Sequence, residues 1–190
     1  MSHSGKILVA GLGSRHGDDQ AGWLVAEQVL KKVSGALEAE EEQDQNLMQE
    51  SSRHLLQHVV VRRAMIPLDL LDWLEGVSIL HVCDACETTQ SHEKLKRFTW
   101  NAGVLVNSDR AGHADVNAAL KLRRGHGSHD FGLPDVLRLA ETTGMLPKQV
   151  IIWAIAGTYF QPEDVMSDET RETVSQAVNE MMKELSVKNR

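Results

Sequence analysis

The feature that most constrains the fold lies at the start of the chain, where an apolar run leads into a glycine-rich turn and then into two adjacent acidic residues. Residues 7–22 read ILVAGLGSRHGDDQAG. An uninterrupted apolar run of this kind is typical of a strand that is buried on both faces of a parallel sheet. In such sheets, functional residues gather beyond the carboxyl ends of the strands. The sequence therefore predicts that the chemistry lies near Asp19.

The glycine-rich turn differs from a dinucleotide-binding loop in spacing and in charge. Gly11, Gly13 and Gly17 follow the pattern G-x-G-x-x-x-G, and Asp18 and Asp19 come next. In a dinucleotide site, backbone N–H groups and a helix N-terminus receive a pyrophosphate. Two carboxylates repel such an anion and suit a cation, or they simply favour the positive end of the helix that follows. The turn alone leaves both interpretations open.

The rest of the chain alternates apolar runs with amphipathic stretches. At 190 residues it is long enough for one well-buried domain and short for two, so we expect residues 1–190 to form one domain. Strands separated by helices predict an α/β protein, a three-layer α/β/α sandwich with a mainly parallel, twisted sheet. The expected strands are 7–12, 58–62, 77–83, 103–107 and 150–156, and the expected helices are 20–33, 67–73, 134–143 and 167–185.

A polar stretch interrupts this alternation at about residues 35–57. It is rich in Glu and Gln and has no apolar stripe, although its residues have some helical propensity. A segment of this composition has too little apolar surface to drive packing. We expect an exposed, partly ordered excursion from the domain.

Charge and hydropathy exclude two classes of partner. The formal net charge is −7, whereas binding to a nucleic-acid backbone needs a clustered basic face. Apart from the pair Arg123 and Arg124, the densest basic cluster is at Lys94, Lys96 and Arg97, and both are expected to be solvated surface. No apolar run reaches the roughly twenty residues that span a bilayer, and the first strand begins too early for a signal peptide to precede it. The sequence predicts a cytoplasmic protein with no nucleic-acid or membrane partner.

Cys83 and Cys86 form a C-x-x-C motif and are the only cysteines of the chain. Such a motif can be a redox pair or half of a zinc site. A redox pair is expected at a helix start, and a structural zinc site needs a second pair that this chain lacks. We expect small buried side chains next to a strand, with metal contact by either thiol as the alternative.

Two further residues extend the site predicted near Asp19. Asp84 directly follows the apolar run 77–83, and His129 lies in a polar loop just before a predicted helix. If the first strand and strand 77–83 are neighbours, Asp19 and Asp84 meet at the same edge of the sheet, where the loop can close over them. Two carboxylates and an imidazole suit a borderline divalent metal such as zinc, nickel, manganese or iron.

Each of these residues, taken alone, has a simpler explanation. An Asp at the end of a strand often caps the next turn, and a loop histidine is usually solvated. The joint placement of the three residues is what favours a metal site. His16 and His126 are candidates for accessory ligands.

Three motifs resemble those of the nickel–iron hydrogenase maturation endopeptidases, in order and in approximate spacing. They are a glycine turn followed by an acid pair, an apolar strand ending in Asp-Ala, and a Ser-His loop that leads into a helix. Here they are residues 7–22, 82–85 and 128–133. Members of this family remove a short C-terminal tail from the hydrogenase large-subunit precursor after nickel has been inserted. The resemblance implies the same endopeptidase activity and the same partner for this chain.

The resemblance also implies roles for the three candidate residues. Asp19, Asp84 and His129 would be both the catalytic and the metal-contacting residues, and the metal would be the nickel already bound in the substrate. Another divalent metal in the isolated protein is the alternative. Whether the metal or a carboxylate activates the attacking water is left open, since both routes use the same residues.

The chain departs from the family pattern in its first motif. Ser14 stands where many members have Asn, the turn is one residue shorter before the acid pair, and Asp19 stands where some members have Glu. Two other functions therefore stay under consideration. One is a non-catalytic accessory protein that binds a metal, or a nucleotide through the loop 11–17. The other is a hydrolase with its own bound divalent metal.

Overall fold

The computed structural model describes residues 5–41, 57–87, 93–101, 103–107, 132–162 and 164–187. Its described strands form one six-stranded sheet in the order β2-β1-β3-β6-β4-β5. The strands are β1 (Lys6–Leu12), β2 (Val59–Ala64), β3 (Val77–Glu87), β4 (Leu95–Asn101), β5 (Val104–Asn107) and β6 (Gln149–Gly157).

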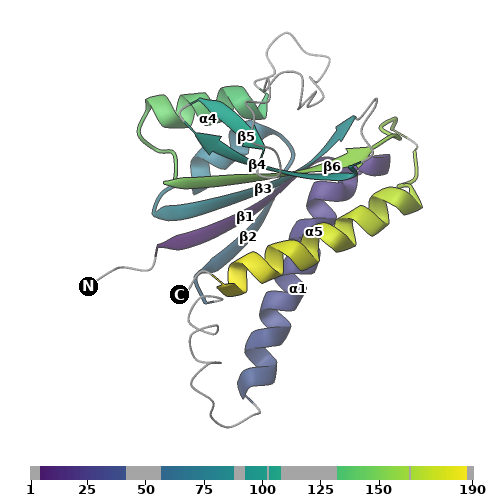
Figure 1. Ribbon diagram of the computed structural model, residues 1–190, viewed down its shortest axis with the longest axis horizontal. Helices are drawn as coiled ribbons and strands as arrows, with labels where there is room; N and C mark the ends of the chain where they lie inside the picture. Colours follow the sequence, from purple (N-terminus) through teal and green to yellow (C-terminus); the bar gives the residue numbers. More distant parts are fainter. Residues whose placement is uncertain are drawn as a thin grey trace.

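Helices cover both faces of this sheet (Figure 1). The helices are α1 (Ala21–Glu41), α4 (Leu133–Thr142) and α5 (Asp168–Val187), with the short 3-10 helices η1 (Gly17–Gln20) and η2 (Pro67–Trp73). One core lies between the sheet and the pair α1 and α5, and a second lies between the sheet and the pair η2 and α4. The predicted three-layer α/β/α sandwich is therefore confirmed.

The sheet is mainly parallel, as predicted. Strands β2, β1, β3 and β6 run in the same direction, whereas β4 is antiparallel to β6 and β5 is antiparallel to β4. Along β1, Ile7 and Val9 pack into the core under α1 and α5, and Leu8 and Ala10 pack into the opposite core. The apolar run of β1 is continuous because both of its faces are buried.

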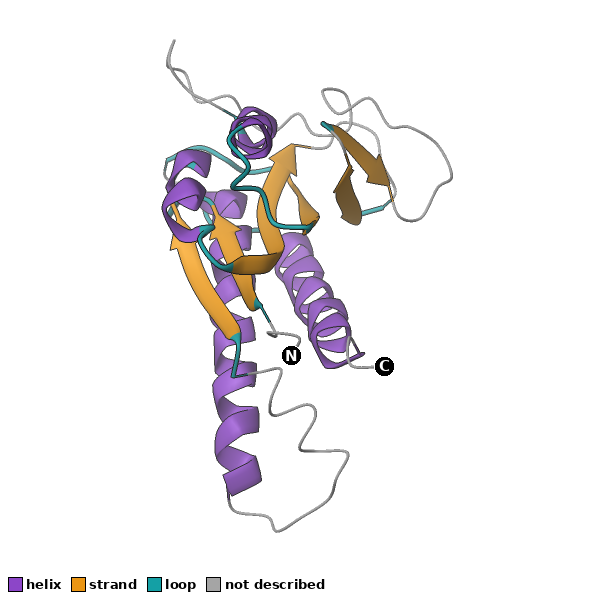
Figure 2. Cartoon of the chain, turned by 90° about the vertical axis from the view of Figure 1, so that its left-hand side faces the viewer, coloured by secondary structure: helices purple, strands orange, loops and turns teal. Residues whose placement is uncertain are grey.

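Helix α1 is longer than the sequence predicts. It continues to Glu41, so the first part of the polar excursion is helical. In Figures 1 and 2 this end of α1 projects beyond the sheet. Ala, Leu and Glu have high intrinsic helix propensity, which explains the extension. The remainder of the excursion, residues 42–56, lies outside the described residues.

Strand β4 was not predicted, because its charged residues were interpreted as solvated surface. For Arg97 that interpretation is wrong. Its guanidinium forms a two-point ion pair with Glu184 of α5, at 2.5 and 3.1 Å, and lies 5.7 Å from the centre of the Trp153 ring. The partners are distant in sequence, so local charge density could not reveal that Arg97 fastens α5 to the sheet.

No helix in the described part of the chain is both long enough and apolar enough to cross a bilayer.

Candidate active site

The candidate site lies where β1 ends beside β3. Gly11 is paired with Cys83, and one residue further along β3 is Asp84. Strand β3 does not end there, as the sequence analysis expected. It continues beside β6 as far as the pair Glu87 and Gly157, because Ala85 and Cys86 still pack into the cores. Asp84 therefore lies inside a strand, level with the turn that follows β1.

Two glycines let helix α1 begin directly against these strands. A Cβ atom on Gly22 would lie 2.1 Å from the carbonyl oxygen of Leu12 and 2.5 Å from that of Cys83. A Cβ atom on Gly11 would lie 2.1 Å from the carbonyl oxygen of Gly22. No side chain fits at either position. This close approach brings η1, which carries Asp19, to the side of β3.

The other two glycines of the first motif shape the turn itself. Gly13 has φ +148° and Gly17 has φ +47°, conformations that other residues rarely adopt. A Cβ atom on Gly13 would lie 2.0 Å from the carbonyl oxygen of Asp19, and one on Gly17 would lie 2.1 Å from that of Tyr159. The space beside these glycines is thus occupied by the chain's own backbone. This packing does not resemble a cradle for phosphate, and it argues against a nucleotide loop.

Asp18, the first acid of the pair, is fully buried and holds the turn in place. Its carboxylate accepts hydrogen bonds from the backbone N–H groups of Thr158, Tyr159 and Ser167, at 2.7, 3.0 and 2.8 Å, and from the Ser167 hydroxyl at 3.0 Å. Burial by itself raises the pKa of Asp18, but these bonds outweigh it and hold the pKa below its ordinary value. Asp18 therefore links the turn after β1 to the segment between β6 and α5.

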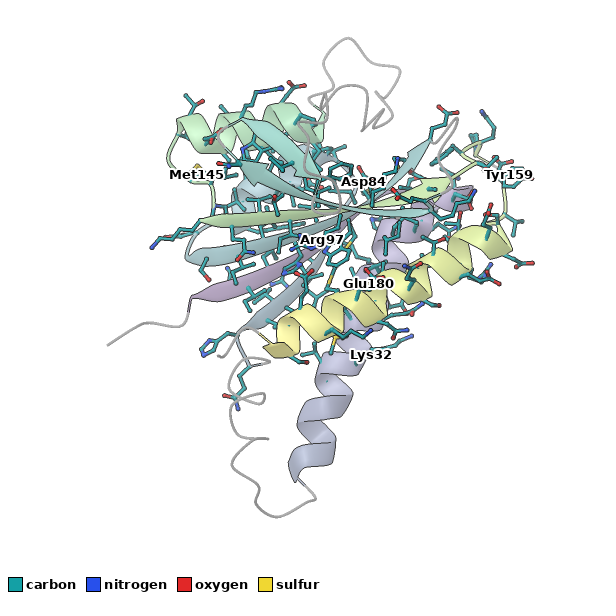
Figure 3. The ribbon with its side chains drawn as sticks, viewed as in Figure 1. Lys32, Asp84, Arg97, Met145, Tyr159 and Glu180 are labelled. Atoms are coloured by element: carbon teal, nitrogen blue, oxygen red, sulfur yellow. The ribbon has the colours of Figure 1, made fainter. Side chains whose placement is uncertain are left out.

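The surroundings of Asp84 shift its pKa in the direction opposite to that of Asp18. Burial, together with the nearby carboxylate of Asp19, raises the pKa of Asp84 to about 8, although a hydrogen bond from the Ala85 backbone opposes the shift. Like charges at close range and loss of water both disfavour the ionised form. Figure 3 labels Asp84 in the middle of the sheet. The structure therefore brings Asp19 and Asp84 close enough for their charges to interact, in surroundings that favour the neutral form of Asp84.

His129, the third candidate residue, lies outside the described residues, as does His126. Within the part of the chain that the structure describes, no group of three or more His, Cys, Asp or Glu side chains is placed to hold a metal ion. The described site is thus a pair of carboxyl groups. Carboxylate oxygens are ligands for divalent metals, and the pair offers them beside the turn that follows β1.

His16 stands in the same turn but is engaged elsewhere. Its Nδ1 atom lies 2.6 Å from the carbonyl oxygen of Pro162, which can only accept, so Nδ1 carries the hydrogen. This bond is a second link between the turn after β1 and the segment after β6. It leaves Nε2 as the one ring nitrogen that is able to act as an accessory ligand.

The C-x-x-C motif is neither a redox pair nor half of a zinc site. Cys83 packs into the core under α1 and α5, and Cys86 packs into the opposite core. Residues three apart on a strand face opposite sides of the sheet, so the two thiols cannot meet. Burial, with a smaller effect of Asp84, raises the pKa of both thiols, that of Cys86 to about 12. The prediction of small buried side chains is confirmed.

The structural role of Asp18 was missed by sequence reasoning. The adjacent acids were visible, but nothing local distinguishes the buried one from the one beside Asp84. The hydrogen-bond donors to Asp18 lie 140 to 149 residues further along the chain. Only the packing of the segment after β6 against the turn after β1 reveals which acid is which.

Comparison with protein-family models and with curated proteins gave no match. Solved structures, in contrast, are similar over nearly the whole chain. The hydrogenase maturating endopeptidase HybD from Escherichia coli aligns with a TM-score of 0.59 at 16% identity, covering 95% of this chain and 91% of that one. At such identity the likeness shows the fold.

Two further solved structures are similar to this chain over most of its length. An endopeptidase from Escherichia coli aligns with a TM-score of 0.57 at 17% identity, covering 93% of this chain and 89% of that one. The nickel–iron hydrogenase maturation protease HycI from Thermococcus kodakarensis aligns with a TM-score of 0.55 at 15% identity, covering 97% and 94%. The chain has the fold of the hydrogenase maturation proteases, which is the fold that the three motifs imply.

Proposed function

We propose that this chain is a hydrogenase maturation endopeptidase, which removes the C-terminal tail of a nickel–iron hydrogenase large-subunit precursor after nickel insertion. The observation that carries the proposal is the meeting of Asp19 and Asp84 beside the carboxyl end of β1, with the pKa of Asp84 raised to about 8. Perturbed carboxyl pairs of this kind mark functional sites. The names of the similar structures, which describe maturation endopeptidases, support this activity.

In this proposal, the metal is part of the substrate. Asp19, Asp84 and His129 would contact nickel that is already bound in the precursor, so that an unloaded precursor is left uncut. Oxygen and imidazole nitrogen ligands suit nickel. A cation that binds between the two carboxyl groups would displace the proton from Asp84, since metal ligands must be deprotonated.

The cleavage step requires an activated water molecule near the scissile carbonyl. One of the two carboxylates can act as general base, or the metal can lower the pKa of a water molecule that it binds. Both routes need Asp19 and Asp84 beside each other. Both routes are also consistent with a site at the end of β1, where the close packing at Gly11 and Gly22 sets the position of η1.

The proposal is tested by the intact mass of the large subunit from cells that make nickel-loaded precursor. Cells with the wild-type chain should contain the shortened subunit. Cells with no copy, or with Asp19→Asn, Asp84→Asn or His129→Ala, should retain the tail. Asp168→Asn, which changes an exposed carboxylate at the start of α5, is the matched control and should leave processing intact. Removal of the tail in cells without the chain would refute the proposal.

Metal analysis separates this function from that of a hydrolase with its own metal. The proposed endopeptidase should be purified with its site empty or filled below stoichiometry, because nickel arrives with the precursor. One tightly bound divalent ion per chain, lost together with activity in Asp19→Asn, would favour the hydrolase.

A further inference from the structure

A group of large apolar side chains is exposed directly after the edge strand β2. Met65 is 72% exposed and Ile66 is 51% exposed, and Leu68, in the 3-10 helix η2 that follows, is 42% exposed. Leu70, also in η2, is in contrast fully buried. Single exposed apolar residues are ordinary, but several that follow one another closely in the chain can form an interaction surface. We call residues 62–68 the β2 platform.

Hydrogen bonds hold the backbone of the platform in a defined conformation. The carboxylate of Asp69 accepts hydrogen bonds from the backbone N–H groups of Met65 and Ile66, at 3.1 and 3.4 Å. The backbone just before them is also fixed. The carbonyl oxygen of Ala64 accepts bonds from Gly13 N–H at 3.2 Å and from Trp23 Nε1 at 2.8 Å. The first of these bonds joins the platform to the turn that carries the acid pair.

The platform is basic, although the chain as a whole is acidic. Arg62 and Arg63 are both exposed. Arg62 donates a hydrogen bond from Nη1 to the carbonyl oxygen of its neighbour Val61, at 3.2 Å, and no acidic side chain of the described residues pairs with it. Arg63 lies 5.3 Å from the centre of the Trp23 ring. Within the described part of the chain, no acidic group competes for the Arg62 guanidinium, which can therefore bind an anionic group of a partner.

The backbone of β2 is available as well. Among the described strands, β2 pairs only with β1, so one side of it has no partner strand there. An extended peptide can add to such an edge through main-chain hydrogen bonds, while side-chain contacts provide the selectivity. Exposed apolar side chains beside an exposed arginine and a strand edge suit a peptide better than they suit a small metabolite, which needs an enclosing pocket.

We propose that the β2 platform binds the C-terminal tail of the polypeptide substrate, with apolar tail side chains on Met65 and Ile66 and the terminal α-carboxylate on Arg62. This inference rests on the proposed function and adds to it the surface that holds the tail. The platform lies next to β1, whose end leads to Asp19. In a tail bound there, the scissile bond lies beside the acid pair, and the residues that follow this bond lie on the platform.

The test uses a synthetic peptide with the sequence of the precursor's last fifteen or so residues, labelled at its N-terminus, in free-acid and amide forms. Binding to the full-length chain is followed by fluorescence anisotropy. The double variant Met65→Ser/Ile66→Ser should weaken the Kd at least tenfold. The control Leu139→Ser/Met145→Ser removes two apolar side chains that are also exposed, Leu139 to 39% and Met145 to 42%, and Figure 3 shows Met145 at the end of the sheet away from Tyr159. It should bind as the wild type does.

The charge contact is tested with the same peptides. The wild-type chain should prefer the free acid over the amide, and Arg62→Gln should abolish this preference. Unchanged binding by Met65→Ser/Ile66→Ser, or equal binding of acid and amide by the wild type, would overturn the platform. Thermal melts of each variant check that the exposed substitutions leave the fold intact.

Processing of the nickel-loaded precursor separates the two proposals. If the wild type cuts the precursor and the double variant does so with a raised KM and an unchanged kcat, both stand. If the wild type cuts and the double variant has the wild-type KM, the platform is wrong and the endopeptidase stands. If the wild type does not cut, the endopeptidase fails and the platform fails with it.

Discussion

The turn after β1 and the middle of β3 both place an aspartate at the same end of the sheet, yet the two carboxyl groups are in opposite conditions. Asp18, in the turn, accepts four hydrogen bonds and has a lowered pKa. Asp84, in the strand, loses water and faces Asp19, and its pKa is raised to about 8. The first carboxylate is stabilised by the fold, whereas ionisation of the second is opposed by it.

This difference separates an acid with a structural role, Asp18, from Asp84, the acid that we propose takes part in the reaction. The donors around Asp18 are all satisfied by it, so the residue fastens two segments and has no ligand capacity to spare. The surroundings of Asp84 disfavour its charged form and so cost stability. Folded proteins tolerate such a cost where function requires it. A bound cation would reverse the balance at Asp84 and would gain nothing at Asp18.

The largest effect is expected from removing the charge of Asp18. In Asp18→Asn, an amide group replaces one acceptor oxygen and faces buried donors, which should lower the free energy of unfolding by about 3 kcal/mol. Urea denaturation measures the change. Asp168→Asn, at an exposed position, should cost less than about 0.5 kcal/mol. Equal effects of the two substitutions would show that Asp18 is not the fastening residue.

For Asp84, unlike Asp18, we expect removal of the charge to raise the free energy of unfolding at neutral and higher pH. Below about pH 4 its carboxyl group is protonated in both the folded and the unfolded chain. Between about pH 4 and pH 8, the unfolded chain loses this proton while the folded chain keeps it, so the contribution to stability falls as pH rises, and it levels off above the folded pKa of about 8.

Asp84→Asn removes this dependence. The variant should be more stable than the wild type at pH 8 by at least about 1.4 kcal/mol, the equivalent of one pKa unit, while being unable to process the precursor. The advantage should shrink towards pH 4. Urea denaturation at a series of pH values provides the measurement, and a variant that is less stable than the wild type at pH 8 would contradict the raised pKa.

The smallest effect tests whether the two acids of the pair interact. Asp19→Asn removes a negative charge beside Asp84 and should lower the pKa of Asp84, but by less than burial has raised it, because burial is the larger cause. Carboxyl NMR titration of Asp84 follows the change. Glu87→Gln, further along β3, serves as the control. A pKa that stays the same in Asp19→Asn would mean that the two carboxyl groups are not neighbours.

Local patterns were sufficient for most elements of the fold. The apolar runs of β1, β3 and β6 and the amphipathic stretches of α4 and α5 were placed within a few residues of their positions in the structure. Strand β4 was missed because its identity depends on pairing with β6, and the charged residues within it find partners only across the sheet. The end of β3 was placed too early because Asp84 reads as a terminus, although the strand pairs past it.

The sequence by itself determined the alternation of strands and helices, and from it the prediction that Asp19 and Asp84 meet at one sheet edge. These properties follow from periodicity and from the geometry of parallel strands, which are local or nearly so. Tertiary structure alone decided which acid is buried among donors, which one resists ionisation, and which apolar side chains stay exposed beside them. Hydrogen bonding, desolvation and exposure depend on neighbours that are distant in the chain, and no local pattern encodes them.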